Sequence, residues 1–354
     1  MANQYRVGII GCGRKPVPDA QGRVRTGIAE SHGRAYAAVP NATLVAAADI
    51  DPENLTSFCE RHHVPHGYGD YHEMLAQEHL DIVSVCTWVS LHSRIVIDAA
   101  AARPKAILCE KPMALTIPEA DAMVAACAAN KVRLAINHQR RLGEPFRRAK
   151  ELLTSGMIGS PLRFEAHVPG GTLLDWGTHW IDMFFYYLDQ EPVEWVMAMA
   201  DRHTDRVLFG EEQEDHAIVH YQFRSGVRAY LDLGVPIVRQ PANRLIGTEG
   251  IIELGVSPGT PLRVHRYTSA GWEDIPVKEG IHGIEHFIHS VEALIEAVEQ
   301  DAEPAHSGAN GRQALEVILA AYSSVGQRGK VYLPYCAEES AMRELMALWR
   351  QQRT

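Results

Sequence analysis

The sequence predicts an α/β protein: an amino-terminal doubly wound parallel sheet, followed by an α+β domain with a large, mainly antiparallel sheet. Three observations support this fold class. Short apolar segments alternate with helical segments over residues 1–131, as in parallel βαβ units. A glycine-rich turn follows the first apolar segment, where such folds bind nucleotides. After residue 159, strand-like segments follow one another without helices between them, which favours antiparallel pairing.

The composition limits the class of protein. The 354 residues suffice for two domains with separate cores, and 46% apolar with 22% charged residues is ordinary for a globular protein. A net charge of -10 does not favour a nucleic-acid-binding surface. Six cysteines without a C-x-x-C pair argue against a disulfide framework or a zinc site. Without a signal peptide or an apolar run of ~20 residues, we expect a cytoplasmic protein that binds neither metal nor membrane.

The first predicted strand, residues 5–11, enters the turn Gly11-Cys12-Gly13. If residues 14–26 are removed in thought, Gly11, Gly13 and Ala29 form a G-x-G-x-x-A dinucleotide fingerprint. Gly11 then gives the tight turn, Gly13 lets the backbone approach pyrophosphate, and Ala29 permits close packing of the next helix. We therefore interpret 14–26 as an insertion in the phosphate loop. Its four cations and one acid leave open a solvated loop or a lid over an anionic ligand.

The second predicted strand, residues 43–49, ends in Asp49. Asp49 lies 38 positions after Gly11, or 25 without the 13-residue insertion, near the ~20 expected for the acid that binds the adenosine ribose. The alternative is a strand-end aspartate that starts a turn. A carboxylate at this place repels a 2′-phosphate, so NAD is favoured over NADP.

The alternation continues to the end of the first domain. Helices are expected at 33–39, 52–61, 71–77, 92–102 and 117–129, and strands at 81–86, 106–109 and 132–137. The strand 106–109 leads directly into Glu110-Lys111-Pro112, where ligands bind in open α/β sheets. Lys111 is therefore placed to meet a ligand, although a solvated lysine paired with Glu110 is an equal alternative.

The second domain, residues 132–354, is expected to bind substrate and to mediate oligomerisation. Its predicted strands are 162–168, 195–200, 216–223, 227–233, 243–247, 251–254 and 262–267, and its later helices are 285–299 and 308–325. Between the first two strands, Asp175 and His179 are four residues apart and fall on one helical face. A carboxylate beside an imidazole suits acid/base chemistry, although Asp175 could instead only cap the helix.

These features together resemble the family of glucose–fructose oxidoreductase, inositol dehydrogenase and the rhizopine-catabolism oxidoreductases (Gfo/Idh/MocA). The residues that carry the resemblance are Gly11-x-Gly13…Gly27-x-Ala29, Asp49, Glu110-Lys111-Pro112, Asp175-x-x-x-His179 and the segment from Gly311 to Pro334. The likeness spans essentially the whole chain. Two departures from the family pattern are the insertion 14–26 and Trp88, which stands where the family often has proline.

The resemblance implies a Rossmann domain, a sheet domain and a nicotinamide cofactor. It implies that Lys111 contacts the reacting hydroxyl, that His179 moves the hydroxyl proton, and that Asp175 assists and binds substrate. Less closely matched positions near cofactor or substrate are Thr87, His92 and His138. The resemblance also suggests that a helix at 308–326 packs on the Rossmann domain.

Two activities remain open from the sequence. The first is NAD-dependent transfer of hydride from a secondary hydroxyl of a sugar, sugar derivative or cyclitol. The second is an NAD-dependent glycoside hydrolase that oxidises a ring hydroxyl transiently, eliminates the aglycone, adds water and returns the hydride. A non-catalytic nucleotide sensor is disfavoured because Lys111, Asp175 and His179 are present together. We expect a homodimer or homotetramer formed through the carboxy-terminal sheet.

Overall fold

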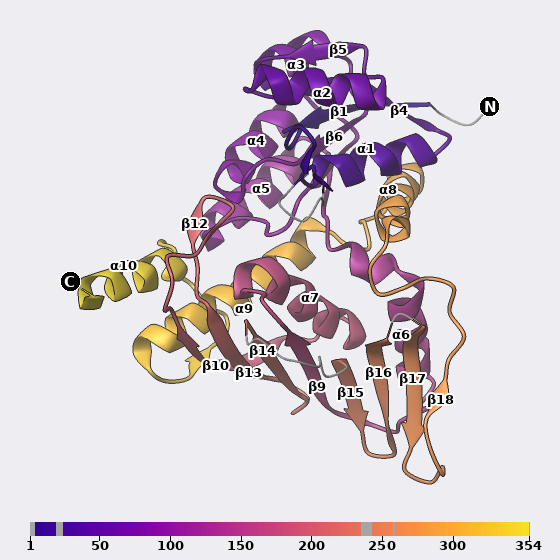
Figure 1. Ribbon diagram of the computed structural model, residues 1–354, viewed down its shortest axis with the longest axis vertical. Coiled ribbons are helices and arrows are strands. Elements are labelled where there is room, and N and C mark those ends of the chain that lie inside the picture. The colour runs from indigo at the N-terminus through magenta and orange to yellow at the C-terminus, as the bar shows by residue number, and fades with distance from the viewer. Residues whose placement is uncertain (1–3, 19–23, 235–242, 258, 354) are drawn as a thin grey trace. The chain divides into compact units, whose positions relative to one another are not determined.

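The protein forms two compact units, which are described separately. The computed structural model describes residues 4–18, 24–234, 243–257 and 259–353 (Figure 1). The first unit comprises Met1–Ala114, Glu119–Gln139 and Ile284–Ala309. The second comprises Leu115–Pro118, Arg140–Gly283 and Asn310–Thr354.

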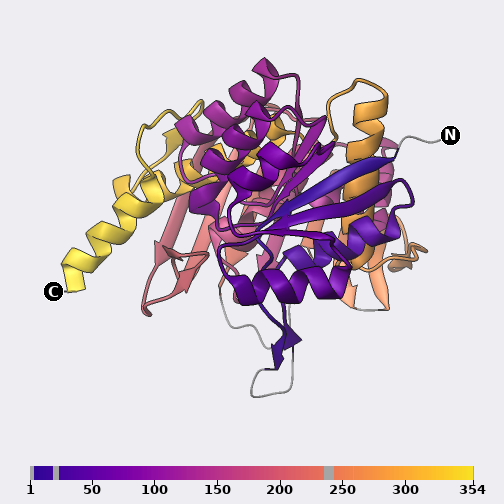
Figure 2. The same cartoon turned by 90° about the horizontal axis from the view of Figure 1, so that it is seen from above.

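The first unit contains a six-stranded parallel sheet with the order β5-β4-β1-β6-β7-β8. Its strands are β1 (Tyr5–Ile10), β4 (Ala42–Ala48), β5 (His66–Tyr68), β6 (Ile82–Val85), β7 (Ala106–Cys109) and β8 (Arg133–Ile136). Its helices are α1 (Ala29–Ala38), α2 (Pro52–His62), α3 (Tyr71–Gln77), α4 (Val89–Ala101), α5 (Ile117–Ala129) and α8 (Ile284–Glu299). Helices lie on both faces of the sheet in Figure 2, which confirms the doubly wound fold.

One expectation about the division of the chain needs correction. The expected boundary between residues 131 and 132 would separate β8 from the first unit, but β8 pairs with β7 and completes that sheet. The helix expected at 308–326 is α9 (Gly308–Gln327), and from Asn310 onward it groups with the second unit. The later helix that packs within the first unit is α8, because Val291, Leu294 and Ile295 join its buried core.

Residues 14–26 leave and rejoin the phosphate loop at neighbouring points. The Arg14 backbone N–H donates to the Thr26 carbonyl oxygen at 2.8 Å, and short strands β2 (Val17–Pro18) and β3 (Val24–Arg25) pair antiparallel. Helix α1 then begins at Ala29, four residues before the expected start at 33, because the completed turn already aligns the chain with the helix. Residues 19–23 of the insertion, including two of its charged residues, lie outside the described residues.

The second unit is built on a nine-stranded mixed sheet with the order β18-β17-β16-β15-β9-β14-β13-β10-β19. The strands are β9 (Pro161–Val168), β10 (Val193–Asp201), β13 (His216–Phe223), β14 (Arg228–Leu233), β15 (Asn243–Gly247), β16 (Gly250–Ser257), β17 (Thr260–Arg266), β18 (Glu273–Asp274) and β19 (Val331–Tyr332). Among the described residues, β14 and β9 are the only strands of this sheet that pair in parallel. The mainly antiparallel prediction is therefore confirmed.

The remaining elements of the second unit surround this sheet. They are the single-turn helices η1 (Gln139–Leu142) and η2 (Leu173–Gly177), the helices α6 (Glu144–Thr154), α7 (Thr178–Tyr187), α9 and α10 (Ala341–Arg353), and the short pair β11 (Val207–Leu208) and β12 (Glu211–Glu212). Burial alternates along β13, β14 and β15, so one face of the sheet is fully covered and the other only partly.

Two further properties concern the chain as a whole. No helix among the described residues combines the length and apolarity needed to cross a bilayer. All six cysteines are free thiols, four of them buried and Cys336 exposed.

Candidate functional site

A cavity of about 700 Å³ lies at the carboxyl edge of the parallel sheet in the first unit. It forms where β1, β4 and β6 end, at the edge where open α/β sheets bind ligands. Its lining includes the ends of the three strands and the start of helices α3 and α4, with the residues Ile10, Gly11, Gly13, Ala48, Asp49, Ile50, Asp51, Asn54, Asp70, Tyr71, Cys86, Thr87, Trp88, Leu91 and Arg94.

The glycines of this cavity are required by the geometry of the backbone. Gly11 has a φ of +89°, and a Cβ there would lie 2.9 Å from the Thr87 side chain. Gly13 has a φ of +76°, and its Cβ would lie 2.5 Å from the Thr26 carbonyl oxygen. Both positions therefore exclude a side chain, which leaves a turn whose backbone a pyrophosphate can approach. Ala29 is fully buried at the start of α1, as close helix packing requires.

Asp49 lies directly after β4 and is partly exposed in the cavity. Its Oδ2 accepts the Cys12 backbone N–H at 2.7 Å, and its Oδ1 accepts the Asp51 backbone N–H at 2.9 Å. Each carboxylate oxygen retains further acceptor capacity, because an ionised carboxylate has about four lone-pair sites. The carboxylate therefore fixes the phosphate loop and still has capacity to accept a hydrogen bond from a ribose hydroxyl.

Three large apolar side chains surround the cavity and remain exposed. Ile50 is 93% exposed, Trp88 57% and Leu91 42%. Exposed apolar groups around a concave site are typical of a surface that a flat aromatic ligand covers. The buried Thr87 Oγ1 has no hydrogen-bond partner among the described residues, which also fits a ligand at this place. These features suit the adenosine and phosphate parts of NAD.

His92 is buried in α4 and braces two loops at the same edge of the sheet. Its Nδ1 lies 2.9 Å from the Pro112 carbonyl oxygen, and its Nε2 lies 3.0 Å from the Thr87 carbonyl oxygen. Burial lowers the pKa of His92, while the carbonyl contacts oppose that shift. His92 thus ties the segment that follows β6 to the segment that carries Lys111.

Glu110 and Lys111 follow β7, and the Lys111–Pro112 peptide bond is cis. The Glu110 carboxylate is 4% exposed and accepts from His32 Nε2 at 2.8 Å and from Asn137 Nδ2 at 2.6 Å. Burial raises the pKa of Glu110, but the hydrogen bond from His32, with Lys111 and Asn137, outweighs it and holds the pKa below its usual value. A buried, ionised carboxylate therefore stands next to Lys111.

The second unit presents Asp175 and His179 on consecutive turns. Asp175 lies in η2, a single π-helical turn, and His179 is buried in the first turn of α7. The possible capping role of Asp175 is corrected by the structure, because Thr172 is the N-cap and its Oγ1 accepts the Asp175 N–H at 3.2 Å. A π-helical turn of this kind is frequent at functional sites.

A buried carboxylate anchors the start of this segment. Glu214 accepts the Leu173 backbone N–H at 2.6 Å and the Tyr322 hydroxyl at 2.7 Å. All of the Glu214 side chain is buried, and burial raises its pKa. The π-helical turn therefore begins at a fixed point, which sets the position of Asp175.

Arg140 is a residue of this region that the sequence reasoning missed. Its guanidinium is 3% exposed and lies 5.1 Å from the ring centre of Trp176 and 4.9 Å from that of Trp180. Burial lowers the pKa of Arg140 to about 9, against the opposing charge of Asp175, so the group stays cationic at neutral pH. Aromatic residues on both sides of Asp175-x-x-x-His179 were the available signal, because an adjacent arginine can stack on them.

The other predicted positions differ in their surroundings. His138 is buried directly after β8, at the carboxyl edge of the first unit. On helix α8, His286 is buried and His289 pairs with Glu292. Among residues 4–18, 24–234, 243–257 and 259–353, no three His, Cys, Asp or Glu side chains converge as metal ligands would.

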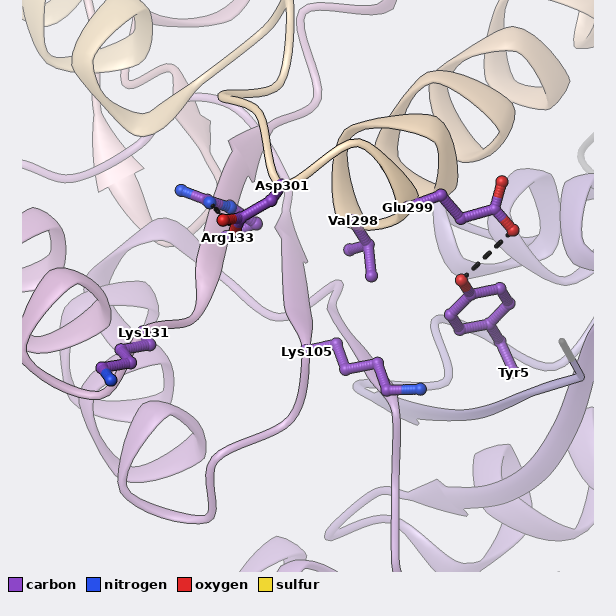
Figure 3. A pocket seen from close by; sticks show the side chains of 7 residues that line it. All are labelled: Tyr5, Lys105, Lys131, Arg133, Val298, Glu299 and Asp301. Atoms are coloured by element: carbon purple, nitrogen blue, oxygen red, sulfur yellow. Dashed lines mark hydrogen bonds and ion pairs between the residues drawn. The ribbon is translucent and has the colours of Figure 1, made fainter.

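A second hollow of about 370 Å³ lies at the opposite, amino edge of the parallel sheet (Figure 3). Its side chains pair with one another: Arg133 with Asp301, and the Tyr5 hydroxyl with Glu299 at 3.3 Å. Lys105 pairs with Asp81 at 3.0 Å. Because its charges are largely matched and it lies away from the carboxyl edge, we assign it no catalytic role.

Comparisons with known proteins agree with this geometry. Residues 5–138 match the family described as "Oxidoreductase family, NAD-binding Rossmann fold", and residues 163–253 match "GFO/IDH/MocA C-terminal domain". The chain is 27% identical to the myo-inositol 2-dehydrogenase of Thermotoga maritima, over 93% of this chain and 98% of the relative.

Solved structures show the same fold. A probable dehydrogenase from Thermotoga maritima is 26% identical, covers 93% of this chain and 98% of its own, and has a TM-score of 0.74. Levoglucosan dehydrogenase, in complex with NADH and levoglucosan, is 21% identical, covers 94% of this chain and 100% of its own, and has a TM-score of 0.81. The protein is an NAD-binding oxidoreductase of the dehydrogenase type, and the chain belongs to the Gfo/Idh/MocA family.

Proposed function

We propose that the protein oxidises a secondary hydroxyl of a sugar, sugar derivative or cyclitol and transfers the hydride to NAD. The observation that carries the proposal is the position of Glu110-Lys111-Pro112 after β7, at the same sheet edge as the Gly11 and Gly13 turn. His92 links this segment to Thr87 of the cavity lining through the two carbonyl oxygens that it contacts. The relatives add support, because one is named for a cyclitol substrate and another was solved with levoglucosan.

In this proposal, Lys111, Asp175 and His179 act on the substrate. Bound NAD supplies the hydride acceptor. His179, in its neutral form, takes the proton of the hydroxyl, since loss of hydride requires loss of that proton. The Lys111 ammonium stabilises negative charge on the reacting oxygen. Asp175 orients the substrate and supports His179, and the guanidinium of Arg140 lies beside the rings of Trp176 and Trp180. We assign His138 to substrate binding.

The proposed cofactor-binding residues are Gly11, Gly13, Ala29, Asp49, Thr87, His92, Glu110 and Lys111. Charge in the cavity supports NAD rather than NADP. Among the described residues, three carboxylates line it, Asp49, Asp51 and Asp70. Arg94 is the one Lys or Arg among these described lining residues, and it already donates to the Tyr71 hydroxyl at 3.2 Å. A 2′-phosphate would add negative charge to this end of the cavity, which costs binding free energy.

The experiment follows absorbance at 340 nm with NAD, and separately with NADP, over free sugars, inositols, sugar acids and glycosides. Net NADH formation with an unsubstituted sugar or cyclitol supports the proposal. Cleavage of a glycoside without net NADH, with solvent deuterium entering beside the oxidised carbon, would replace it by the redox-neutral hydrolase. Neither NADH formation nor glycoside cleavage across the whole panel would contradict the proposed substrate class.

The second unit also supports a proposal about assembly. The partly covered face of the nine-stranded sheet exposes Met197 and Met199 on β10 and Tyr332 on β19. Exposed apolar side chains on adjacent strands favour association with another chain. We infer a homodimer or homotetramer through this sheet.

A further inference from the structure

Glu110 lies where two chains of buried hydrogen bonds converge within the first unit. Its Oε1 accepts from His32 and Asn137, and its Oε2 accepts the Lys111 backbone N–H at 3.2 Å. A carboxylate that is ionised can only accept hydrogen bonds. The proton between His32 and Glu110 is therefore carried by His32 Nε2, and the carboxylate is satisfied by three donors.

The first chain reaches Glu110 from α1 and β6. The Tyr36 hydroxyl lies 2.7 Å from Ser84 Oγ, which lies 3.1 Å from His32 Nδ1. Tyr36, Ser84 and His32 are each at most 1% exposed. The arrangement lets the Tyr36 hydroxyl donate to Ser84, Ser84 donate to His32, and His32 donate to Glu110.

The second chain reaches Glu110 from α8 and the loop that follows it. Ser290 Oγ donates to Asn137 Oδ1 at 2.9 Å, and Asn137 Nδ2 donates to Glu110. Ser290 has one proton, so His306 Nε2, at 3.0 Å, is the donor to Ser290. Each donated proton in this series of hydrogen bonds is directed toward Glu110, and hydrogen bonds aligned in this way strengthen one another.

The charged neighbours of Glu110 are few. Five titratable groups interact electrostatically with Glu110. They lie on α1, at the end of β6, on α4 and at or just after β7, and are His32, Cys86, His92, Cys109 and Lys111. Burial raises the pKa values of Cys86 and Cys109 well above their usual value, so both thiols stay neutral. Burial also lowers the pKa of His92. Lys111 is therefore the cation next to the carboxylate, and His32 contributes the hydrogen bond from its Nε2.

We propose that Glu110 is a positioning residue, held in place by hydrogen bonds from His32 and Asn137, and that its negative charge keeps the Lys111 side chain in place for the reaction. This role rests on the proposed function, in which Lys111 stabilises negative charge on the substrate oxygen. Glu110 does not itself touch the reacting atoms in this account. Glu110 acts through Lys111, the next residue in the sequence. Helix α8 contributes indirectly, because its residue Ser290 donates to Asn137, which in turn donates to Glu110.

The first test needs no substrate. With NADH present, the protein is trace-labelled with acetic anhydride between pH 6 and pH 11, and acetylation of Lys111 is quantified by mass spectrometry. In Glu110→Gln, which keeps the side-chain volume, we expect the acetylation midpoint of Lys111 to fall, because a nearby negative charge favours the charged form of a lysine. Glu78→Gln is the matched control, since Glu78 also pairs with a histidine, His66, in the same unit.

An unchanged midpoint in Glu110→Gln would overturn the proposal, whether or not turnover has been found. A lowered midpoint in a protein that oxidises no compound of the panel would instead sustain this role of Glu110 and contradict the proposed function. NADH fluorescence titration confirms that each variant is folded and binds cofactor.

The second test uses turnover and separates positioning from simple stability. His32→Gln keeps an Nε2 donor for Glu110, whereas His32→Leu removes it. We expect His32→Gln to keep kcat within about threefold, and His32→Leu to lower kcat about 10- to 100-fold with little change in NADH affinity. The acidic limb of the kcat profile should move to higher pH in His32→Leu, because Glu110 then binds a proton more readily. Equal kcat and equal pH profiles for the two variants would contradict the role of His32.

Discussion

The Asp49 carboxylate accepts the backbone N–H of Cys12 at 2.7 Å, so the acid that ends β4 holds the phosphate loop that follows β1. Its other oxygen accepts the Asp51 N–H, which starts α2. One side chain therefore joins two strand ends at the cavity. We propose that this single carboxylate organises the nucleotide site and also influences which cofactor is bound.

Replacing that carboxylate should weaken NAD binding. In Asp49→Asn we expect the KM for NAD to rise about 10-fold or more and the preference over NADP to shrink, because a charge-assisted hydrogen bond contributes roughly 1.5–3 kcal/mol. KM values measured with both cofactors test this. The control is Asp81→Asn, since Asp81 also accepts a backbone N–H, that of Arg6 at 2.9 Å, but at the opposite edge of the sheet. Equal changes in the two variants would contradict the assignment.

Trp88 should contribute to cofactor affinity through its exposed ring. In Trp88→Ala we expect the KM for NAD to rise roughly 10-fold with kcat within about threefold, because an aromatic side chain stacked on a base contributes ~1–3 kcal/mol. Fluorescence titration with NADH measures the affinity directly. Trp272→Ala, on a loop of the second unit where Trp272 contacts Arg263, is the control. An unchanged affinity in Trp88→Ala would remove the ring from the cofactor site.

Removing the hydroxyl group should change the stability of the protein differently at two buried tyrosines, Tyr322 and Tyr187. Tyr322 donates to the buried Glu214, so Tyr322→Phe should lower the free energy of unfolding by about 1–3 kcal/mol. The hydroxyl of Tyr187 has no hydrogen-bond partner among the described residues, so Tyr187→Phe should leave stability unchanged or raise it. Urea unfolding at pH 7 measures both. Similar losses in the two variants would argue against Glu214 as the anchor of the π-helical turn.

Assembly should depend on the partly covered face of the large sheet. Met199 is 70% exposed on β10, and Met199→Glu is expected to lower the molar mass observed by light scattering to that of the 39.3 kDa chain. A charge placed in an apolar interface is costly because it must be desolvated. Leu348→Glu, on α10, is the control. An assembly that persists in Met199→Glu would exclude this part of the sheet from the interface.

Much of the fold followed from local sequence patterns. The strand 106–109 and the helices 71–77 and 117–129 match β7, α3 and α5 residue for residue, because turn residues bracket each apolar pattern. Helix α6, helix α10 and the short strand β5 were missed. The amphipathic pattern of the two helices was present, whereas β5 has three residues and is specified by pairing with β4.

Less of the candidate site than of the fold could be predicted from the sequence. Glycine spacing and the strand-end position suggested Gly11, Gly13 and Asp49, because those signals are local. The environment of Glu110 depends on residues far away in the sequence: His32 is 78 positions before it, and Ser290 reaches it through Asn137 across 153 positions. Arg140 likewise depends on aromatic rings more than thirty positions later. No spacing rule brings such residues together, because the tertiary fold does so.

The most direct measurement is the initial rate of absorbance change at 340 nm with NAD and the best compound of the panel, in wild type, Lys111→Ala and His179→Ala. The account predicts sustained NADH formation in wild type and a ~10²–10⁴-fold lower kcat in each variant, with NADH still bound. Near-normal turnover in either variant would contradict the proposed mechanism at that residue.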